Sequence, residues 1–318
     1  MKCLCCGKPL TTDKELSALW HSSCIQKFFS TKKLPELDLS KASLETLAIA
    51  SVHKGYTIPG VQKKLSLYLS NEDSPHLTLM NYPTGYILKP QTLEFKALPE
   101  AEYLVMQMAK HAGIHTVPFG LMKIESDHTY AYITKRIDRI QSNFKTEKMA
   151  MEDFCQLENR LTQDKYHSSY ERCAKVIQAY SSTPGFDLTE LFLRIVFSFL
   201  VGNSDMHLKN FSLIETKPKS QEYHLSDAYD MLPVNIILPE DKDELALTLN
   251  GKKRNLRKND FLKFSEFCGI NKKSAEKMIA NLISKIDDFI LLCEESYLPN
   301  DMKESIKKLI LERKERLL

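Results

Sequence analysis

The stretch Gly202-Asn203-Ser204-Asp205-Met206-His207-Leu208-Lys209-Asn210-Phe211-Ser212 decides how this chain is interpreted. It follows Phe186–Leu200, which is apolar nearly all round and therefore predicts a helix buried in the middle of a helical domain. Gly202 and Asn203 end that helix and begin a polar loop. Asp and Asn are also common turn residues, so an ordinary hydrogen-bonded loop would explain the same segment. The other segments of the chain decide between a functional loop and a plain turn.

Composition narrows the classes of protein to consider. The 318 residues carry 44 basic and 41 acidic side chains, and the net charge of +3 is too small to indicate direct binding of nucleic acid. No apolar run approaches the roughly 18 residues that a membrane span needs. The opening residues, MKCLCCGK, lack the apolar segment of a secretory signal. We therefore expect a cytoplasmic protein that contacts neither nucleic acid nor membrane directly.

The first half of the chain has the pattern of a sheet. Short alternating apolar runs are bounded by Gly, Pro, Asn and Asp, which predicts mainly antiparallel strands. One helix interrupts them, beginning near Pro99 and ending at Gly113. A further short helix is expected at residues 41–51. The expected strands are Leu65–Leu69, Tyr86–Leu88, Phe119–Ile124 and Tyr130–Thr134.

From about residue 150 onward the pattern is helical. Tyr223–Leu225 is expected to be a strand, and Asn250-Gly251 predicts a small hairpin. Three helices are expected to complete the chain, at residues 259–267, 272–295 and 301–317. The predicted fold is α+β and bilobal. A Cys/His module at 1–30 precedes a small β lobe at 31–140 and a larger all-α lobe at 141–318.

The polar residues of the two lobes fit phosphoryl transfer. This reaction needs phosphates held by a cation, Mg²⁺ held by oxygen ligands, and a hydroxyl oriented by a carboxylate. Asp205 and Asn210 have the Asp-x4-Asn spacing of a kinase catalytic loop. Asp230 follows a strand 20 residues later and could complete the Mg²⁺ shell, with Asp227 as a competitor.

The β lobe supplies a candidate for the cation. Lys89 ends an apolar strand, where it must meet either water or an anion such as a phosphate. Glu102 on the following helix is its expected ion-pair partner. The same sequence would also fit a solvated lysine at the end of an edge strand, with no functional role. Gly60, next to a proline, marks a turn whose N–H groups could face phosphate. The order of these features along the chain, more than any one of them, favours a kinase.

These segments together resemble those of the HipA-type kinases, a family of bacterial toxins. The Gly-Asn-x-Asp-x-His-x-Lys-Asn-Phe motif is the most specific resemblance. The resembling segments, in chain order, are Gly60–Leu65, the strand ending at Lys89, Lys135–Arg139, Glu152–Phe154, Gly202–Ser212 and Ala228–Leu232.

The resemblance implies a role for each matched residue. It makes Asp205 the catalytic base, Asn210 and Asp230 the Mg²⁺ ligands, and Lys89 the contact to the ATP phosphates. The phosphate loop would comprise Gly60, Val61, Gln62 and Lys64, and the hinge to adenosine Lys135, Ile137 and Asp138. His207 would hold the catalytic loop, and Lys209 would approach the γ-phosphate.

The resemblance also implies partners and a mode of regulation. Family members phosphorylate an aminoacyl-tRNA synthetase, are restrained by an antitoxin, and autophosphorylate in the phosphate loop. Only 56 residues precede Thr57, which resembles the short HipT type, in which a separate small protein replaces an N-terminal subdomain. The loop reads Thr57-Ile58-Pro59, so Thr57 is the expected autophosphorylation site.

The first residues of the chain suggest a metal site. Cys3-x2-Cys6 and His21-x2-Cys24 are two ligand pairs separated by 14 residues, a spacing that suits tetrahedral Zn²⁺. Buried cysteines beside a surface histidine would give the same sequence.

Two other interpretations of the whole chain stay open at this point, a non-catalytic pseudokinase and a zinc-nucleated interaction module. A pseudokinase would not need Lys89, Asp205, Asn210 and Asp230 together.

Overall fold

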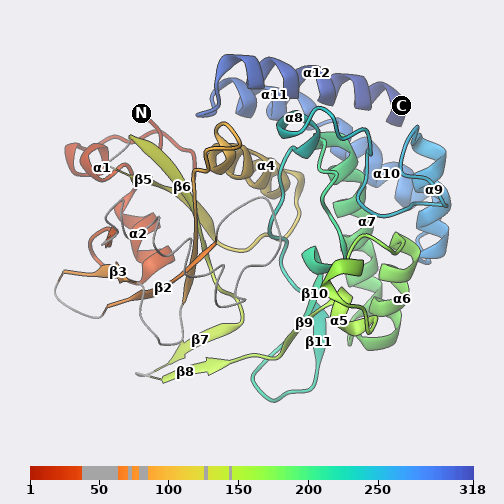
Figure 1. Cartoon of the computed structure of the whole chain (residues 1–318), viewed down its shortest axis with the longest axis horizontal. Coiled ribbons are helices and arrows are strands. Elements are labelled where there is room, and N and C mark those ends of the chain that lie inside the picture. Colours follow the sequence, from red (N-terminus) through yellow and green to blue (C-terminus); the bar gives the residue numbers. More distant parts are fainter. Residues whose placement is uncertain (38–63, 71–73, 79–84, 125–127, 143–144) are drawn as a thin grey trace. The chain divides into compact units, whose positions relative to one another are not determined.

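The computed structural model describes residues 1–37, 64–70, 74–78, 85–124, 128–142 and 145–318 (Figure 1). The chain divides into two compact units. One comprises Met1–Tyr103 with Val117–Arg139 and contains the larger sheet, and the other comprises Leu104–Thr116 with Ile140–Leu318 and is mainly helical. The expected α+β fold, with a strand-rich first half and a helix-rich second half, is confirmed.

The sheet of the first unit has six strands in the order β1-β3-β2-β4-β6-β5. β1 and β3 pair in parallel, and the other pairs are antiparallel. Along β2 the inward residues are buried and the residues between them are not, which is the alternation that the sequence predicted. The strands are β1 (Glu36–Leu37), β2 (Leu65–Leu69), β3 (His76–Thr78), β4 (Tyr86–Pro90), β5 (Phe119–Ile124) and β6 (Thr129–Lys135).

The first residues of the chain pack on this sheet. They contain α1 (Asp13–Ala18) and α2 (Ser22–Phe29). The indole N–H of Trp20 donates to the carbonyl of Leu121 at 3.0 Å, and the amide of Leu121 donates to the carbonyl of Leu4 at 2.8 Å. The rings of Phe28 and Phe29 lie 5.8 and 5.3 Å from that of Tyr86 on β4. The segment and the sheet therefore share one hydrophobic core.

Helix α4 (Leu98–Ala112) follows β4 after a short loop. The side chain of Gln91 holds this loop, because its amide oxygen accepts from the N–H of Leu98 at 3.1 Å while its amide nitrogen donates to the carbonyls of Thr92 and Phe95. These bonds fix where the helix begins relative to the strand. The observed bounds confirm the helix expected between Pro99 and Gly113.

The second unit is built around α7 (Pro184–Val201), whose residues from Leu191 to Val201 are almost all buried. Gly202 ends α7 in the left-handed conformation at φ +77°, as the sequence predicted. The remaining helices are α5 (Phe154–Leu157), α6 (Tyr170–Tyr180), α8 (Val234–Ile237), α9 (Lys258–Phe267), α10 (Lys272–Ile283), α11 (Ile286–Glu294) and α12 (Asn300–Leu317). Within the described part of the chain, helices α6, α9, α10 and α12 and strand β11 (Tyr223–Leu225) pack against α7.

Short strands accompany these helices, so the lobe that we expected to be all-α contains a sheet as well. β9 (Met151–Asp153), β10 (Ser212–Glu215) and β11 (Tyr223–Leu225) form an antiparallel sheet in the order β11-β10-β9. β7 (Arg139–Ser142) and β8 (Lys145–Lys148) form a separate pair. The carboxylate of Asp187 on α7 accepts from the N–H of Leu225 at 2.8 Å, which ties β11 to the central helix.

One detail of the sequence prediction was wrong. The helix expected at 272–295 is two helices, which separate at Ser284 and Lys285, where the Ser284 hydroxyl donates to the carbonyl of Asn281. The small hairpin predicted at Asn250-Gly251 is present: both residues have positive φ, and Leu249 and Lys252 on either side form an antiparallel bridge with two backbone hydrogen bonds of 2.8 and 3.0 Å. The helix expected at 41–51 lies outside the described residues.

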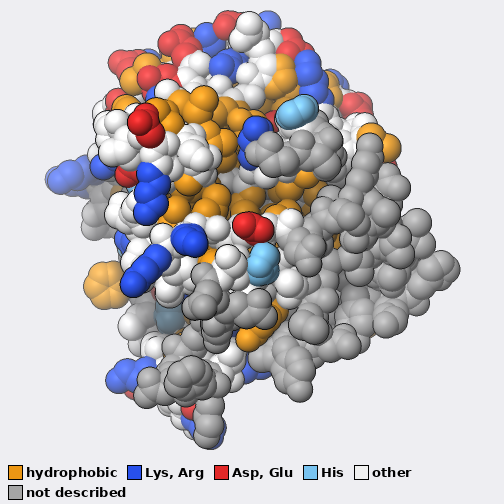
Figure 2. Space-filling view, turned by 90° about the vertical axis from the view of Figure 1, so that its left-hand side faces the viewer, with side chains coloured by type: hydrophobic (Ala, Val, Ile, Leu, Met, Phe, Trp, Pro, Cys, Tyr) orange, Lys and Arg blue, Asp and Glu red, His pale blue; other side chains and the backbone are white. Residues whose placement is uncertain are grey.

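Surface charges are mixed. On the face shown in Figure 2, acidic and basic side chains are interspersed around exposed hydrophobic ones. This mixture agrees with the near balance of 44 basic and 41 acidic residues. None of the helices in the described part of the chain combines the length and the apolar character that crossing a membrane requires.

Gly120 provides a test of the packing between the first residues and the sheet. A Cβ at this position would lie 2.8 Å from two atoms of the Trp20 ring. We expect Gly120→Ala to destabilise the protein by about 1–3 kcal/mol, because the ring must move within a packed core. The matched control is Gly185→Ala in α7, where an added Cβ meets nothing within 4 Å. Urea unfolding of both variants measures the difference, and equal stabilities would contradict the packing described here.

Candidate active site

Lys89 on β4 and Glu102 on α4 form a buried ion pair, as the sequence predicted. The Lys89 Nζ lies 2.5 Å from Glu102 Oε1, and the two side chains are 2% and 0% exposed. The ammonium group also lies 5.1 Å from the ring centroid of Tyr132 on the neighbouring strand β6. Because water is excluded, the attraction is strong and the geometry of the lysine is fixed. A lysine held in this way can present its charge to a phosphate.

The turn after β6 is held by its own charges. Arg136 donates two hydrogen bonds to the Asp138 carboxylate, at 2.9 and 2.7 Å, and Arg139 donates a third. Burial alone would raise the pKa of Asp138, but the guanidinium groups of Arg136 and Arg139 outweigh it and lower the pKa below its usual value. Burial lowers the pKa of Lys135. The carboxylate of Asp138 therefore stabilises the turn that contains Ile137.

The loop after α7 fixes the backbone of Asp205 from both sides. Its amide donates to the side-chain oxygen of Asn203 at 3.3 Å, and its carbonyl accepts from the side-chain nitrogen of Asn210 at 2.7 Å. Asn203 and Asn210 are 0% and 6% exposed. Because the nitrogen of Asn210 is used within the loop, its amide oxygen is the atom that can ligate a cation.

The carboxylate of Asp205 is half exposed and faces two aromatic side chains. The hydroxyl of Tyr166 donates to its Oδ1, and Nε2 of His207 lies 3.9 Å from the same oxygen. The rings of Tyr166 and His207 meet edge to face at 4.9 Å. His207 is 5% exposed, so its ring is packed inside the second unit.

Tyr229, the residue before Asp230, links the segment of Asp230 to that of Lys209. The hydroxyl of Tyr229 donates to the carbonyl of Lys209 at 3.2 Å and lies 2.6 Å from the hydroxyl of Ser212. Asp230 has a positive φ of 55°, which is uncommon for a residue other than glycine. The ammonium group of Lys209 donates to Asp153 at 2.6 Å. Lys209 is thus engaged by a carboxylate of its own unit.

The same loop is anchored to the end of the chain. The hydroxyl of Ser204 donates to Asp241 at 2.6 Å, and the side-chain nitrogen of Asn235 donates to that hydroxyl at 3.3 Å. Arg313 on α12 donates to the side-chain oxygen of Asn235 at 2.6 Å and to the carbonyl of Phe199 at the end of α7. Ser204, the residue before Asp205, is therefore held by side chains that are distant from it in sequence.

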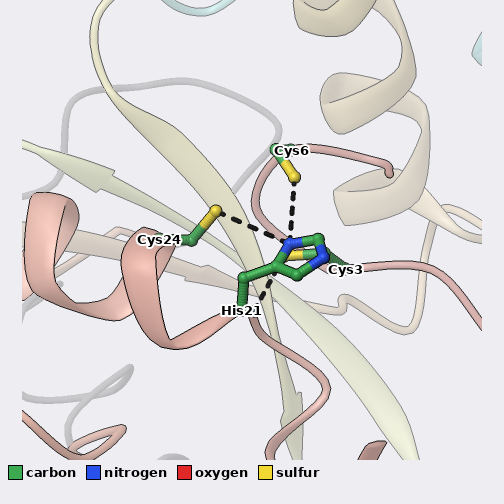
Figure 3. A group of neighbouring side chains, drawn as sticks. All are labelled: Cys3, Cys6, His21 and Cys24. Atoms are coloured by element: carbon green, nitrogen blue, oxygen red, sulfur yellow. Dashed lines mark hydrogen bonds between the residues drawn. The ribbon is translucent and has the colours of Figure 1, made fainter. Parts of the chain in front are cut away.

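The four residues expected to bind zinc lie together (Figure 3). One ligand atom from each of Cys3, Cys6, His21 and Cys24 lies within 4.8 Å of every other. Around a tetrahedral Zn²⁺, Zn–S bonds of about 2.3 Å and Zn–N bonds of about 2.0 Å place sulfur about 3.5 Å from nitrogen. The Sγ atoms of Cys6 and Cys24 lie 3.3 and 3.9 Å from Nδ1 of His21. This donor set fits zinc.

Groups around the cluster orient its ligands. Nε2 of His21 lies 2.9 Å from the carbonyl of Pro9, which accepts its proton and leaves the lone pair of Nδ1 facing the thiols. The amide of His21 donates to Sγ of Cys3 at 3.3 Å. Burial alone would raise the pKa of Cys3, but backbone N–H donors, among them that of Cys6, lower it below its usual value. Burial and the neighbouring cysteines raise the pKa of Cys24.

Several of the predicted site residues lie outside the described part of the chain, and two residues that contact the Asp205 loop were not predicted. Thr57, Gly60, Val61 and Gln62 lie outside the described residues, whereas Lys64 is exposed just before β2. The contacts of Tyr166 and Asp153 with the loop were not predicted. They lie 39 and 56 residues from their partners in sequence. Local spacing carries no signal of contacts made at such separations.

Comparison with known proteins identifies the family. The model of the HipA-like C-terminal domain matches residues 56–290, so the chain belongs to this family. A "Putative kinase" of Haemophilus influenzae is 27% identical over 95% of this chain and 93% of its own length. "Putative kinase Y4dM" of Sinorhizobium fredii is 31% identical, and the match spans 63% of this chain and half of that protein.

Solved structures agree on a protein-kinase-like fold. HipA in a complex of the Shewanella oneidensis MR-1 toxin–antitoxin system with HipB and operator DNA superposes with a TM-score of 0.69 at 18% identity. That match covers 82% of this chain and 64% of that one. The Helicobacter pylori proinflammatory kinase CtkA gives a TM-score of 0.52 at 17% identity, over 75% of this chain and 87% of its own.

The buried pair in the first unit can be tested by removing one partner. Glu102→Gln is expected to destabilise the protein by about 3–5 kcal/mol, because the Lys89 ammonium loses its buried counter-ion. Lys308→Met is the control, since it breaks a pair between side chains that are 79% and 64% exposed. Denaturant unfolding measures both variants. A Glu102→Gln protein as stable as the control would show that the pair does not form as described.

Proposed function

We propose that this chain is a serine/threonine protein kinase that transfers the γ-phosphoryl group of ATP to a hydroxyl on another protein. The observation that best supports this is the fixed loop around Asp205, held by Asn203 and Asn210, in a chain of the HipA-like family. A half-exposed carboxylate on a rigid loop can accept the proton of a substrate hydroxyl.

The remaining roles follow from charge and ligand chemistry. Asn210, through its amide oxygen, and Asp230 would hold Mg²⁺, which prefers oxygen ligands and supplies charge neutralisation when bound. Lys89, oriented by Glu102, would contact the ATP phosphates. In the proposal, the loop from Gly60 to Lys64 covers these phosphates. Lys135, Ile137 and Asp138 form the hinge beside adenosine, and the Lys209–Asp153 pair holds the loop until ATP is bound.

The wider biological role rests on family membership. We propose a cytoplasmic toxin of a toxin–antitoxin system that phosphorylates an aminoacyl-tRNA synthetase, is restrained by an antitoxin, and autophosphorylates at Thr57. The solved Shewanella HipA was seen with HipB, which supports an antitoxin partner. The chain spans about half of the Sinorhizobium relative and 64% of the Shewanella HipA chain. A small accessory protein as a partner is part of the proposal.

A test of the catalytic role uses Asp205→Asn. We expect phosphate transfer from radiolabelled ATP·Mg²⁺ to cell proteins to fall about 10²–10⁴-fold, because the substrate hydroxyl loses its base. Asp288→Asn, which changes an exposed aspartate on α11, is the matched control. Phosphoproteomics after brief expression, wild type against Asp205→Asn, would identify the target and any phosphate on Thr57. Growth inhibition that survives Asp205→Asn would favour the pseudokinase interpretation.

Substitution of two neighbouring aspartates tests which of them binds the metal. Asp230→Asn should raise the Mg²⁺ concentration needed for half-maximal transfer, whereas Asp227→Asn should leave it unchanged. The reverse result would assign the metal to Asp227.

We also propose that Cys3, Cys6, His21 and Cys24 bind a structural Zn²⁺. Four protein ligands close the coordination shell, which is typical of structural and not catalytic sites. The four residues lie on the segment that packs on the sheet through Trp20. Because Phe28 and Phe29 of this segment pack against Tyr86 on β4, the metal would also stabilise that strand.

Metal analysis of the purified protein tests the zinc site. We expect about one zinc per chain in the wild type and less than about 0.2 in Cys6→Ser, because a lost thiolate opens the shell. Cys5→Ser is the control, since Cys5 neighbours the group in sequence but is not one of the four. Wild-type protein below about 0.2 zinc per chain would rule the site out, and loss of zinc in Cys5→Ser would change its assignment.

A further inference from the structure

Tyr166 forms a hydrogen bond with the candidate base. Its hydroxyl donates to Oδ1 of Asp205, a residue 39 positions further along the chain. Tyr166 is 39% exposed, so it lies at the surface beside this carboxylate. Neither the spacing of the loop nor the resemblance to HipA-type kinases assigned it a role.

The hydroxyl of Tyr166 is a permanent donor. Burial raises the pKa of Tyr166, and the negative charge of Asp205 raises it further, so the phenol keeps its proton throughout the physiological range. The hydroxyl therefore presents its hydrogen to the carboxylate of Asp205.

The segment that carries Tyr166 is attached to the loop. The amide of Leu208 donates to the carbonyl of Lys165 at 3.2 Å, and the ring of Tyr166 packs on the edge of His207. The ammonium group of Lys165 lies 5.0 Å from the ring centroid of Tyr166. Beyond the loop, the Tyr170 hydroxyl donates to the carbonyl of Met206 at 3.0 Å. These contacts of Lys165 and Tyr166 with the loop fix the position of the phenol beside the Asp205 carboxylate.

We infer that Tyr166 is a positioning residue for the phosphoryl transfer proposed above, holding the Asp205 carboxylate in the orientation that accepts the substrate hydroxyl. The inference rests on the proposed function. Asn203 and Asn210 fix the backbone of Asp205, but neither bond restricts rotation of its side chain. The Tyr166 hydroxyl supplies this restriction by holding one carboxylate oxygen. Tyr166 acts through Asp205 and forms no bond to the phosphoryl group.

The test is Tyr166→Phe, which removes the hydroxyl and keeps the ring. With ATP·Mg²⁺ and dephosphorylated casein as acceptor, we expect kcat to fall about ten- to a hundredfold, the effect of losing a hydrogen bond to a charged group. KM for ATP should stay unchanged, since Tyr166 does not hold the nucleotide. Tyr180→Phe is the matched control, because Tyr180 on α6 is 53% exposed and remote in sequence from the loop.

Other outcomes would overturn the inference. An unchanged kcat would show that the hydroxyl does not position the base, and a raised kcat would mark Tyr166 as an occupant of the substrate's place. A fall in kcat matched by an equal loss of folded protein in circular dichroism would make Tyr166 merely structural. Wild-type protein that transfers phosphate neither to casein nor to itself would end the proposed function as well, whereas an active wild type with an unaffected variant ends only this inference.

Discussion

A helix that is apolar on every side cannot be stable in water unless other elements enclose it, and α7 imposes this constraint on the second unit. Helices α6, α9, α10 and α12 and strand β11 all contact it. The chain has to leave this enclosed helix without burying unpaired backbone groups. Gly202 permits the exit at positive φ, and the polar side chains that follow provide the hydrogen bonds. The position of Asp205 is thus a consequence of how α7 ends.

The two units hold their charged residues by different means. Lys89 is almost fully buried, and the Glu102 carboxylate helps to compensate the cost of removing its charge from water. Asp205 is partly exposed and shares hydrogen bonds with the neutral side chains of Tyr166, Asn203 and Asn210. The first arrangement keeps a cation in one position. The second leaves a carboxylate in reach of solvent.

The elements that depend on local pattern were predictable from the sequence. Alternation located β2, and the all-round apolar segment located α7. The cluster of Cys3, Cys6, His21 and Cys24 was predictable too, since two tight pairs need only one close approach to form a site. Contacts between distant segments were not, among them Tyr166 with Asp205 and Arg313 with Asn235. The break at Ser284 was also invisible, because no Gly or Pro marks it. These features depend on which surfaces meet after folding, and residue spacing does not encode that directly.

Arg313 has a consequence for the order of events during translation. It reaches Asn235 and the carbonyl of Phe199 from the last helix, α12, 78 and 114 residues away. While the ribosome is still elongating the chain, the segment containing Asp205 has emerged but this guanidinium has not. The nascent polypeptide therefore lacks one support of the loop around Asp205 until Arg313 has left the ribosome, so this loop completes its contacts later than its own synthesis.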